Sequence, residues 1–465
     1  MKLRTGASAS GVLVCAILAA ACSSADGSVS DGPASDGPVG EATSALDVVD
    51  VVEGAFEFAK ALPGTNGRSC ATCHVPEDHF TLTPAHVAAL YAKNPKDPLF
   101  NPIDADDPTA AVPTYEHLMA GLVRVNVPLA ANLDVVDANG NVVTNAERTI
   151  AFWRSVPTIE NTSYTGPYQD DSRAATLQIQ ADGALHAHSQ ITYEPSEQLL
   201  DQISDFESTV YSDLAAVEVA ATVAQGRTPP PVDLHFPPGS DEAAGQVLFQ
   251  NICAQCHGTG TTQIIVNEAV HDSLFAVINS NGTINITETL PNGVSIPAQV
   301  HHDLPDHHDV NIGISGIQGL RQLEILPALL PKTVDFPQYW IRFYTDATRT
   351  QTIYDLPPPP PAIGQSTAPE AFSVDPGRAI ITGDPNDWEG FKVPQLRGIA
   401  HTAPYFRDAS APDLPTVLEI YSTLILPEIV PLNTPAIYPP ANPYGLPESL
   451  STTQKAQLLA FLQYL

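Results

Sequence analysis

The sequence predicts a mainly α-helical protein of two domains with long irregular loops. The chain has 465 residues, and a folded domain usually takes about 100–200. Helix-start signals recur along the chain, whereas alternating strand patterns are few. Proline is abundant, with 44 residues, so much of the chain must form extended or irregular loop.

The N-terminus has the pattern of an export signal, residues 1–22. Lys2 and Arg4 precede an apolar stretch that is too short to span a bilayer. The Leu and Ala residues before Cys22 resemble a bacterial lipobox, which predicts a lipid on Cys22 and attachment to a membrane. The alternative is plain signal-peptide cleavage and a soluble periplasmic protein. Residues 23–45 are rich in Ser, Gly, Asp and Ala, which predicts a flexible tether.

The net charge narrows the choice of partners. Twenty Lys and Arg face 52 Asp and Glu, a formal net charge of -32. Nucleic-acid binding needs clustered basic residues, so this composition argues against it. The acidity favours a basic partner such as a cationic electron-donor protein. The alternative is that the negative charge only keeps the chain soluble.

Four of the six cysteines form two identical patterns, each followed at once by histidine. Cys15 lies within the signal and Cys22 at its end. The patterns are Cys70-Ala71-Thr72-Cys73-His74 and Cys253-Ala254-Gln255-Cys256-His257. C-x-x-C-H is the attachment signal for a c-type haem. The two thiols bond the haem, and the histidine is placed to ligate the iron. The sequence therefore predicts two covalently bound haems, with His74 and His257 as ligands.

Two other interpretations of the cysteines remain open. A redox-active pair would suit a βαβ context and has no need of the histidine. A tetrahedral zinc site would have to join pairs that lie far apart in the sequence, and it explains neither histidine.

The motifs divide the mature chain into two cytochrome c-like haem domains. We expect the first at residues 46–226 and the second at residues 239–465. A proline-rich linker at 227–238 would join them. Residues 356–361 form a proline run that must be extended.

Three serines mark predicted helix starts. Ser196 precedes an apolar face that includes Ile203 and Phe206. Ser240 is followed by two acidic residues and leads into the second motif. Ser451 and Gln454 form a capping box for a helix that buries Leu458, Phe461, Leu462 and Leu465. Weak strand signals occur at 283–287 and 294–300.

The chain resembles the bacterial di-haem cytochrome c peroxidases from about Gly54 to its C-terminus. In the second half the resemblance lies in Asp375-Pro376-Gly377-Arg378-Ala379, in residues 391–400 and in Thr402-Ala403-Pro404-Tyr405-Phe406. In the first half it lies in Val156-Pro157-Thr158 and in Asp171-Ser172-Arg173-Ala174, with Leu177 and Gln180.

This resemblance implies a division of labour between the haems. Hydrogen peroxide would react at the N-terminal haem, and the C-terminal haem would relay electrons from a small cytochrome or a residue of a partner protein. Gln180 falls on the distal-pocket glutamine. The resemblance also implies a calcium ion between the haems, with Thr402 and the backbone of Pro404 as ligands. Ser155 stands where the third ligand, usually Asn, is expected.

The sixth ligand of the second haem cannot be the methionine of the ordinary branch. The chain has only Met1 and Met119, and neither lies in the second region. The ligand position falls on Tyr421, which resembles the MauG-like, tyrosine-ligated branch whose members oxidise residues of a partner protein. A phenolate stabilises ferric iron. The alternative is that Tyr421 is a core residue on an amphipathic helix.

Three positions depart from the family pattern. Arg407 replaces a His, Asp170 replaces the Trp between the haems, and Gln190 stands near the expected distal carboxylate. Peroxide cleavage needs a group that moves a proton between the two oxygens. We therefore expect catalytic roles for Gln180, His188 and Glu194, with His186 as a further candidate. Either histidine could instead close the first iron.

The remaining candidates each have two interpretations. Trp153 and Trp388 could carry electrons or simply pack in the core. The histidines at 301, 302, 307 and 308 suggest a metal site or a solvated loop, and Met119 suggests core packing. For the whole chain we expect a peroxide-dependent oxidoreductase of the periplasm or cell envelope. The alternative is a non-catalytic electron-transfer cytochrome.

Overall fold

The computed structural model describes most of the chain. The described residues are 48–137, 139–227, 229, 232–257, 283–289, 295–301, 309–310, 334–337, 339–356, 374–384, 387, 390–426, 447 and 449–465. The predicted signal with Cys22, the tether, most of the proline run, Trp388 and the histidines at 302, 307 and 308 lie outside them. No helix within the described residues is long and apolar enough to cross a membrane.

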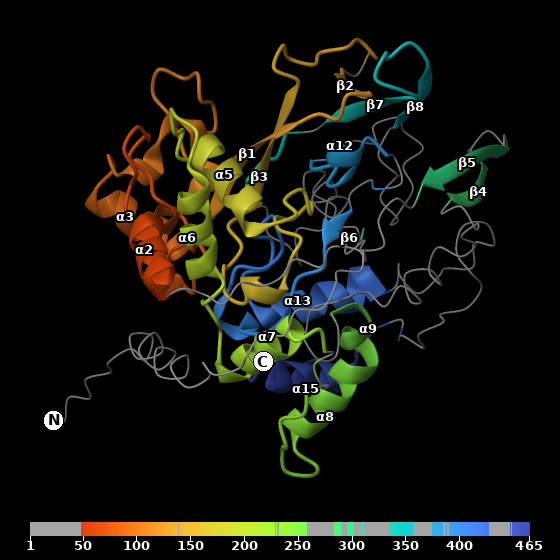
Figure 1. Ribbon diagram of the computed structural model, residues 1–465. Coiled ribbons are helices and arrows are strands. Elements are labelled where there is room, and N and C mark those ends of the chain that lie inside the picture. Colours follow the sequence, from red (N-terminus) through yellow and green to blue (C-terminus); the bar gives the residue numbers. More distant parts are fainter. Residues whose placement is uncertain are drawn as a thin grey trace, which may run out of the picture.

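The chain forms helices and short strands joined by long loops (Figure 1). The helices are α2 Val48–Ala59, α3 Pro84–Lys93, α4 Glu116–Met119, α5 Leu177–Ala187, α6 Glu197–Glu207, α7 Leu214–Ala224, α8 Asp241–Leu248, α9 Ala254–His257, α12 Ala379–Thr382, α13 Leu414–Ile420 and α15 Thr452–Leu462. The strands are β1 Leu122–Pro128, β2 Leu133–Val136, β3 Thr149–Ser155, β4 Thr283–Thr289, β5 Ser295–His301, β6 Asp309–Val310, β7 Trp340–Tyr344, β8 Thr352–Leu356 and β9 Phe391–Lys392.

The predicted helix starts are confirmed. Ser196, Ser240 and Ser451 cap α6, α8 and α15, each accepting a backbone N–H with its hydroxyl. The predicted buried residues of α15 are buried. Weak signals at 283–287 and 294–300 correspond to β4 and β5, which pair antiparallel.

The fold is more mixed than the mainly α prediction. β1 pairs with β3, and β2, β7 and β8 form a second antiparallel sheet. The apolar residues of these strands bury a core with Leu99, Leu118 and Ile380, against which Met119 packs as expected. The prediction missed these strands because their alternating patterns are short and lie between loops.

Two helix pairs lie in different parts of the molecule, α2 with α6 and α8 with α15 (Figure 1). In the first pair, α2 lies against α6 so closely that a Cβ on Gly54 would come within 1.8 Å of the Gln202 carbonyl oxygen. In the second, a Cβ on Gly245 of α8 would come within 2.0 Å of the Gln457 oxygen of α15. Only glycine allows such an approach. The glycines therefore mark one crossing that occurs twice.

The aromatic packing beside the two crossings also matches. The ring centroids of Phe58 and Phe206 lie 5.1 Å apart, and those of Phe249 and Phe461 lie 5.2 Å apart. Each of these pairs joins the helix that leads into a C-x-x-C-H motif to the helix that covers it. The two motif regions are therefore structural repeats.

A second stretch of each repeat aligns without a gap, residues 156–177 with residues 393–414. Asn161 and Gly398 both have left-handed backbone angles, with φ of 70° and 77°. In each stretch a tyrosine hydroxyl donates to the start of the preceding 3₁₀ turn, Tyr168 to Thr162 and Tyr405 to Ile399. This equivalence allows the two sites to be compared position by position.

Candidate haem sites

The first motif begins in a short 3₁₀ turn, Cys70–Thr72, at the end of the segment that follows α2. His74 comes one residue after Cys73, and its Nδ1–H donates to the Phe80 carbonyl at 3.0 Å. Burial lowers the pKa of His74 to about 4, which favours the neutral ring. With Nδ1 protonated and bonded, the lone pair of Nε2 is left for a metal.

The second histidine has the same arrangement. Its Nδ1–H donates to the Pro394 carbonyl at 2.9 Å, and burial lowers the pKa of His257. Pro394 aligns with Pro157, whose backbone also hydrogen-bonds His74. The Nε2 atom of His257 faces the Tyr421 hydroxyl at 3.4 Å. The two predicted ligands of the second iron therefore face each other.

These residues fit a haem iron between them. His257 would offer a nitrogen and Tyr421 a phenol oxygen to that iron, and the two atoms lie 3.4 Å apart in this structure. Tyr421 lies in a π-helical turn, Tyr421–Ile425, that continues α13, and its ring packs near Phe406.

The described cysteines of the two motifs lie in separate cores. Cys70 packs against the α2–α6 core and Cys253 against the α8–α15 core, so the two pairs do not converge on one ion. Cys70 and Cys73 are not joined by a disulfide. Burial raises the pKa of Cys73 to about 11 and that of Cys70 still further, so both free thiols are neutral.

The two repeats differ at the position that faces the histidine. Continuing the alignment of the two stretches along α5 and α13 places Ala184 opposite Tyr421 and Gln180 opposite Val417. Ala184 is half-buried and has no atom that could ligate a metal. At this position the first repeat therefore has no side chain that could ligate a metal, whereas the second repeat has Tyr421.

The predicted proton-transfer residues lie at different depths. Gln180 and His188 are half-buried, and His188 is within electrostatic reach of His74. Glu194 is exposed and lies beside Asp182 and His186. The potential metal-ligand atoms of these three side chains lie within 4.8 Å of one another. Of the three predicted proton-transfer residues, His188 is the residue whose charge acts on the first histidine.

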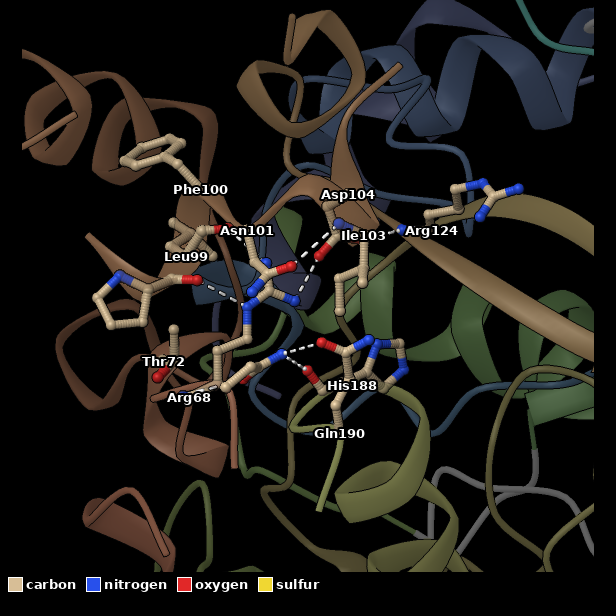
Figure 2. A network of polar contacts seen from close by, with 12 residues as sticks. Arg68, Thr72, Leu99, Phe100, Asn101, Ile103, Asp104, Arg124, His188 and Gln190 are labelled. Atoms are coloured by element: carbon tan, nitrogen blue, oxygen red, sulfur yellow. Dashed lines mark hydrogen bonds and ion pairs between the residues drawn. The ribbon is translucent and has the colours of Figure 1, made fainter. Parts of the chain in front are cut away.

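Arg68 is the centre of a buried polar network next to this site (Figure 2). Its guanidinium donates to Asp104 at 2.6 Å, to the Leu99 carbonyl at 2.5 Å and to the Pro98 carbonyl at 2.8 Å. Both charged side chains are at most 1 % exposed. Burial lowers the pKa of His188, and the nearby Asp104 partly opposes this effect. The network therefore holds a neutral His188 beside a fixed ion pair.

Asn66 ties the same network to the His188 segment. Its side-chain amide donates to the His188 carbonyl at 3.0 Å and to the Gln190 side chain at 3.1 Å (Figure 2). Gln190, at the position expected for a distal carboxylate, is exposed. The sequence analysis missed Arg68, although an arginine two residues before Cys70 was a visible signal.

A second buried charge network joins the two repeats. Arg154 pairs with Asp171 at 2.6 Å and with Asp375 at 2.8 Å, and all three side chains are buried. Arg407 also pairs with Asp375 and lies over the Phe391 ring. Burial raises the pKa of Asp170. Arg407 and Asp170, which stand where the resemblance led us to expect a His and a Trp, therefore belong to this junction.

The residues expected to bind calcium lie at the same junction. The Ser155 hydroxyl donates to the Phe406 carbonyl at 3.1 Å, and the Thr402 hydroxyl lies 3.4 Å from the Ile399 carbonyl. The set with Pro404 offers neutral oxygens only, and the nearby carboxylates of Asp171 and Asp375 pair with arginines. The junction is thus charge-paired by its own side chains, and this donor set does not fit calcium well.

Trp153 is buried and stacks on His117, with ring centroids 4.1 Å apart. Both ring nitrogens of His117 are hydrogen-bonded, Nδ1 to Asp106 and Nε2 to the Asp335 carbonyl, each at 2.7 Å. This packing suits the core role that was one of the two expectations for Trp153.

Comparisons with known proteins give structural likeness at low identity. No family model and no curated protein match the sequence. A MauG-like protein associated with microbial copper homeostasis is 16% identical, with 92% of this chain and 91% of that chain covered and a TM-score of 0.42. The diheme peroxidase BthA from Burkholderia thailandensis E264 is 14% identical, with 90% and 86% covered and a TM-score of 0.40. Kuenenia stuttgartiensis hydrazine synthase is 12% identical, with 94% and 98% covered and a TM-score of 0.35.

Proposed function

We propose that this protein is an exported di-haem c-type oxidoreductase that reduces hydrogen peroxide at the haem bound by His74. Electrons would reach that haem through the one bound by His257, from a small cytochrome or a residue of a partner protein. The two repeats would correspond to haem domains at residues 46–226 and 239–465. Cys70 and Cys73 would hold one haem, and Cys253 and Cys256 the other.

One observation carries the proposal: Tyr421 faces His257, whereas its equivalent in the first repeat is Ala184. A tyrosine ligand would close the second iron and favour its ferric state. The first iron would keep one open coordination position, because Ala184 has no side-chain atom that can ligate a metal. Open and closed irons in one chain are what a division between reaction and electron relay requires.

The haem would supply the redox chemistry, and the chain supplies positioning and proton transfer. The Nδ1 bonds of His74 and His257 to backbone carbonyls fix which nitrogen each ring offers. His188 is half-buried and neutral, so it could accept a proton at one peroxide oxygen and return it to the other. Gln180 would orient the peroxide from α5. Glu194 would act only as a surface proton source, because it is exposed.

The test is an absorption and EPR spectrum of the haem-loaded protein before and after hydrogen peroxide. The proposal expects one high-spin and one low-spin haem at rest and a change in both spectra on addition of peroxide. If both haems are low-spin and peroxide only bleaches them, the catalytic proposal fails. The chain would then be a non-catalytic electron-transfer cytochrome, with His188 the first candidate for the residue that closes the first iron.

A further inference from the structure

A buried carboxyl group lies beside the first haem motif. Glu207 is the last residue of α6 and is 4 % exposed. Its Oε2 atom has no hydrogen-bond partner among the residues that the structure describes. The carboxyl is within electrostatic reach of the Cys70 thiol, which stands in for the sulfur that would carry the haem.

The second repeat has leucine at the same place. The crossing that matches Gln202 with Gln457 and Phe206 with Phe461 also matches Glu207 with Leu462. Leu462 is buried and packs in the same core as Cys253. The fold therefore accepts an apolar side chain here, and packing gives no reason for a carboxyl. A buried, unpaired acid costs stability, which suggests that another role maintains it.

The groups around Glu207 do not neutralise it. From the loop before α5, the Thr162 hydroxyl donates to the backbone carbonyl of Glu207, not to its carboxyl. On α2 the acids Asp50 and Glu53 accept from Gln202, more than one turn away along α6. Burial raises the pKa of Glu207 to about 8, and burial is the one cause of that shift.

We propose that Glu207 is the proton-exchanging group of the first haem site. The carboxylate takes up one proton from solvent when one electron enters that haem, and it releases the proton when the electron leaves. Only the O–H bond of the carboxyl forms or breaks, and the electron comes from the donor of the proposed function, on which this inference rests. A buried negative charge opposes the arriving electron, and protonation removes that opposition.

The test is the reduction potential of each haem in the full haem-loaded chain, measured by optical redox titration at several pH values. One proton per electron changes the equilibrium constant tenfold per pH unit, which is about 59 mV for one electron. We expect this slope for the first haem of the wild type above about pH 8, where the carboxyl is ionised before the electron arrives. Glu207→Gln should abolish it, while the second haem, which has Leu462, stays as it is.

Matched variants make the result specific. Glu160→Gln removes another buried carboxyl, one that is hydrogen-bonded to His79, and should keep the slope. Glu207→Leu copies the second repeat and serves if the glutamine variant folds poorly. A slope that survives in both Glu207 variants, or one that Glu160→Gln removes, overturns the proposal. Measuring a reduction potential does not require catalytic turnover. A chain that does not react with peroxide can therefore still support or contradict this proposal.

Discussion

Replacing Tyr421 by phenylalanine should open the second iron. The phenol oxygen lies 3.4 Å from Nε2 of His257, and the substitution removes only that oxygen. The remaining ring keeps its packing near Phe406, with centroids 6.3 Å apart. We therefore expect a folded protein that loses one iron ligand and keeps its ring packing.

The assay is a cyanide titration followed by absorption, because an open ferric haem takes up cyanide readily. The wild type should bind one cyanide per chain, at the haem of His74, and Tyr421→Phe should bind two. The reciprocal change is Ala184→Tyr, which places a phenol at the equivalent position of the first repeat and should reduce the number to none. Ala184→Phe adds the same bulk without the oxygen and should still bind one.

The outcomes separate the two interpretations of Tyr421. If Tyr421→Phe still binds one cyanide per chain, the tyrosine is a core residue, and the comparison of the two repeats gives no information about ligands. If the wild type binds none, some other residue closes the first iron. In that case the non-catalytic electron-transfer alternative is favoured.

Further predictions concern stability. Gly54→Ala would force a Cβ to within 1.8 Å of a carbonyl oxygen and should cost about 3 kcal/mol in chemical denaturation, whereas Gly183→Ala, which meets nothing within 4 Å, should cost nothing. Asp375→Asn removes one partner of the buried Arg154 and should cost about 3–5 kcal/mol; an unchanged melting temperature would contradict the ion-pair network. Chelation with EDTA should leave the melting temperature and haem spectra unchanged. A lower melting temperature after EDTA would instead support calcium binding at the junction. Glu207 has its pKa raised from 4.5 to about 8, so the folded state holds a proton that the unfolded state releases. Wild-type stability should therefore fall as pH rises from 4.5 to 8, and melting curves of Glu207→Gln should lack that fall.

The sequence predicted the parts of the site that local chemistry determines. The motif histidines and the capped helices could be found because each depends on neighbours close in the chain, whereas Tyr421 was found through the family resemblance. The pairing of His257 with Tyr421 came from a resemblance, and the 3.4 Å approach of the two side chains agrees with it.

Long-range contacts could not be predicted in this way. Arg154 meets Asp375 across more than two hundred residues, and no local pattern selects that aspartate. Glu207 was open to prediction, because it falls on the apolar face of α6 that Leu199 and Ile203 define. An acid at such a position is a signal that periodicity alone can reveal.

The order of the elements along the chain sets an order of assembly. Both helices of the first crossing, α2 and α6, precede α8, so the first core can close before the second repeat has been synthesised. Until the second half is folded, Arg154 can pair with Asp171 but not with Asp375. α15 arrives last and covers Cys253. A stalled or truncated chain would thus carry a half-compensated buried arginine, which destabilises it and makes it more susceptible to proteolysis.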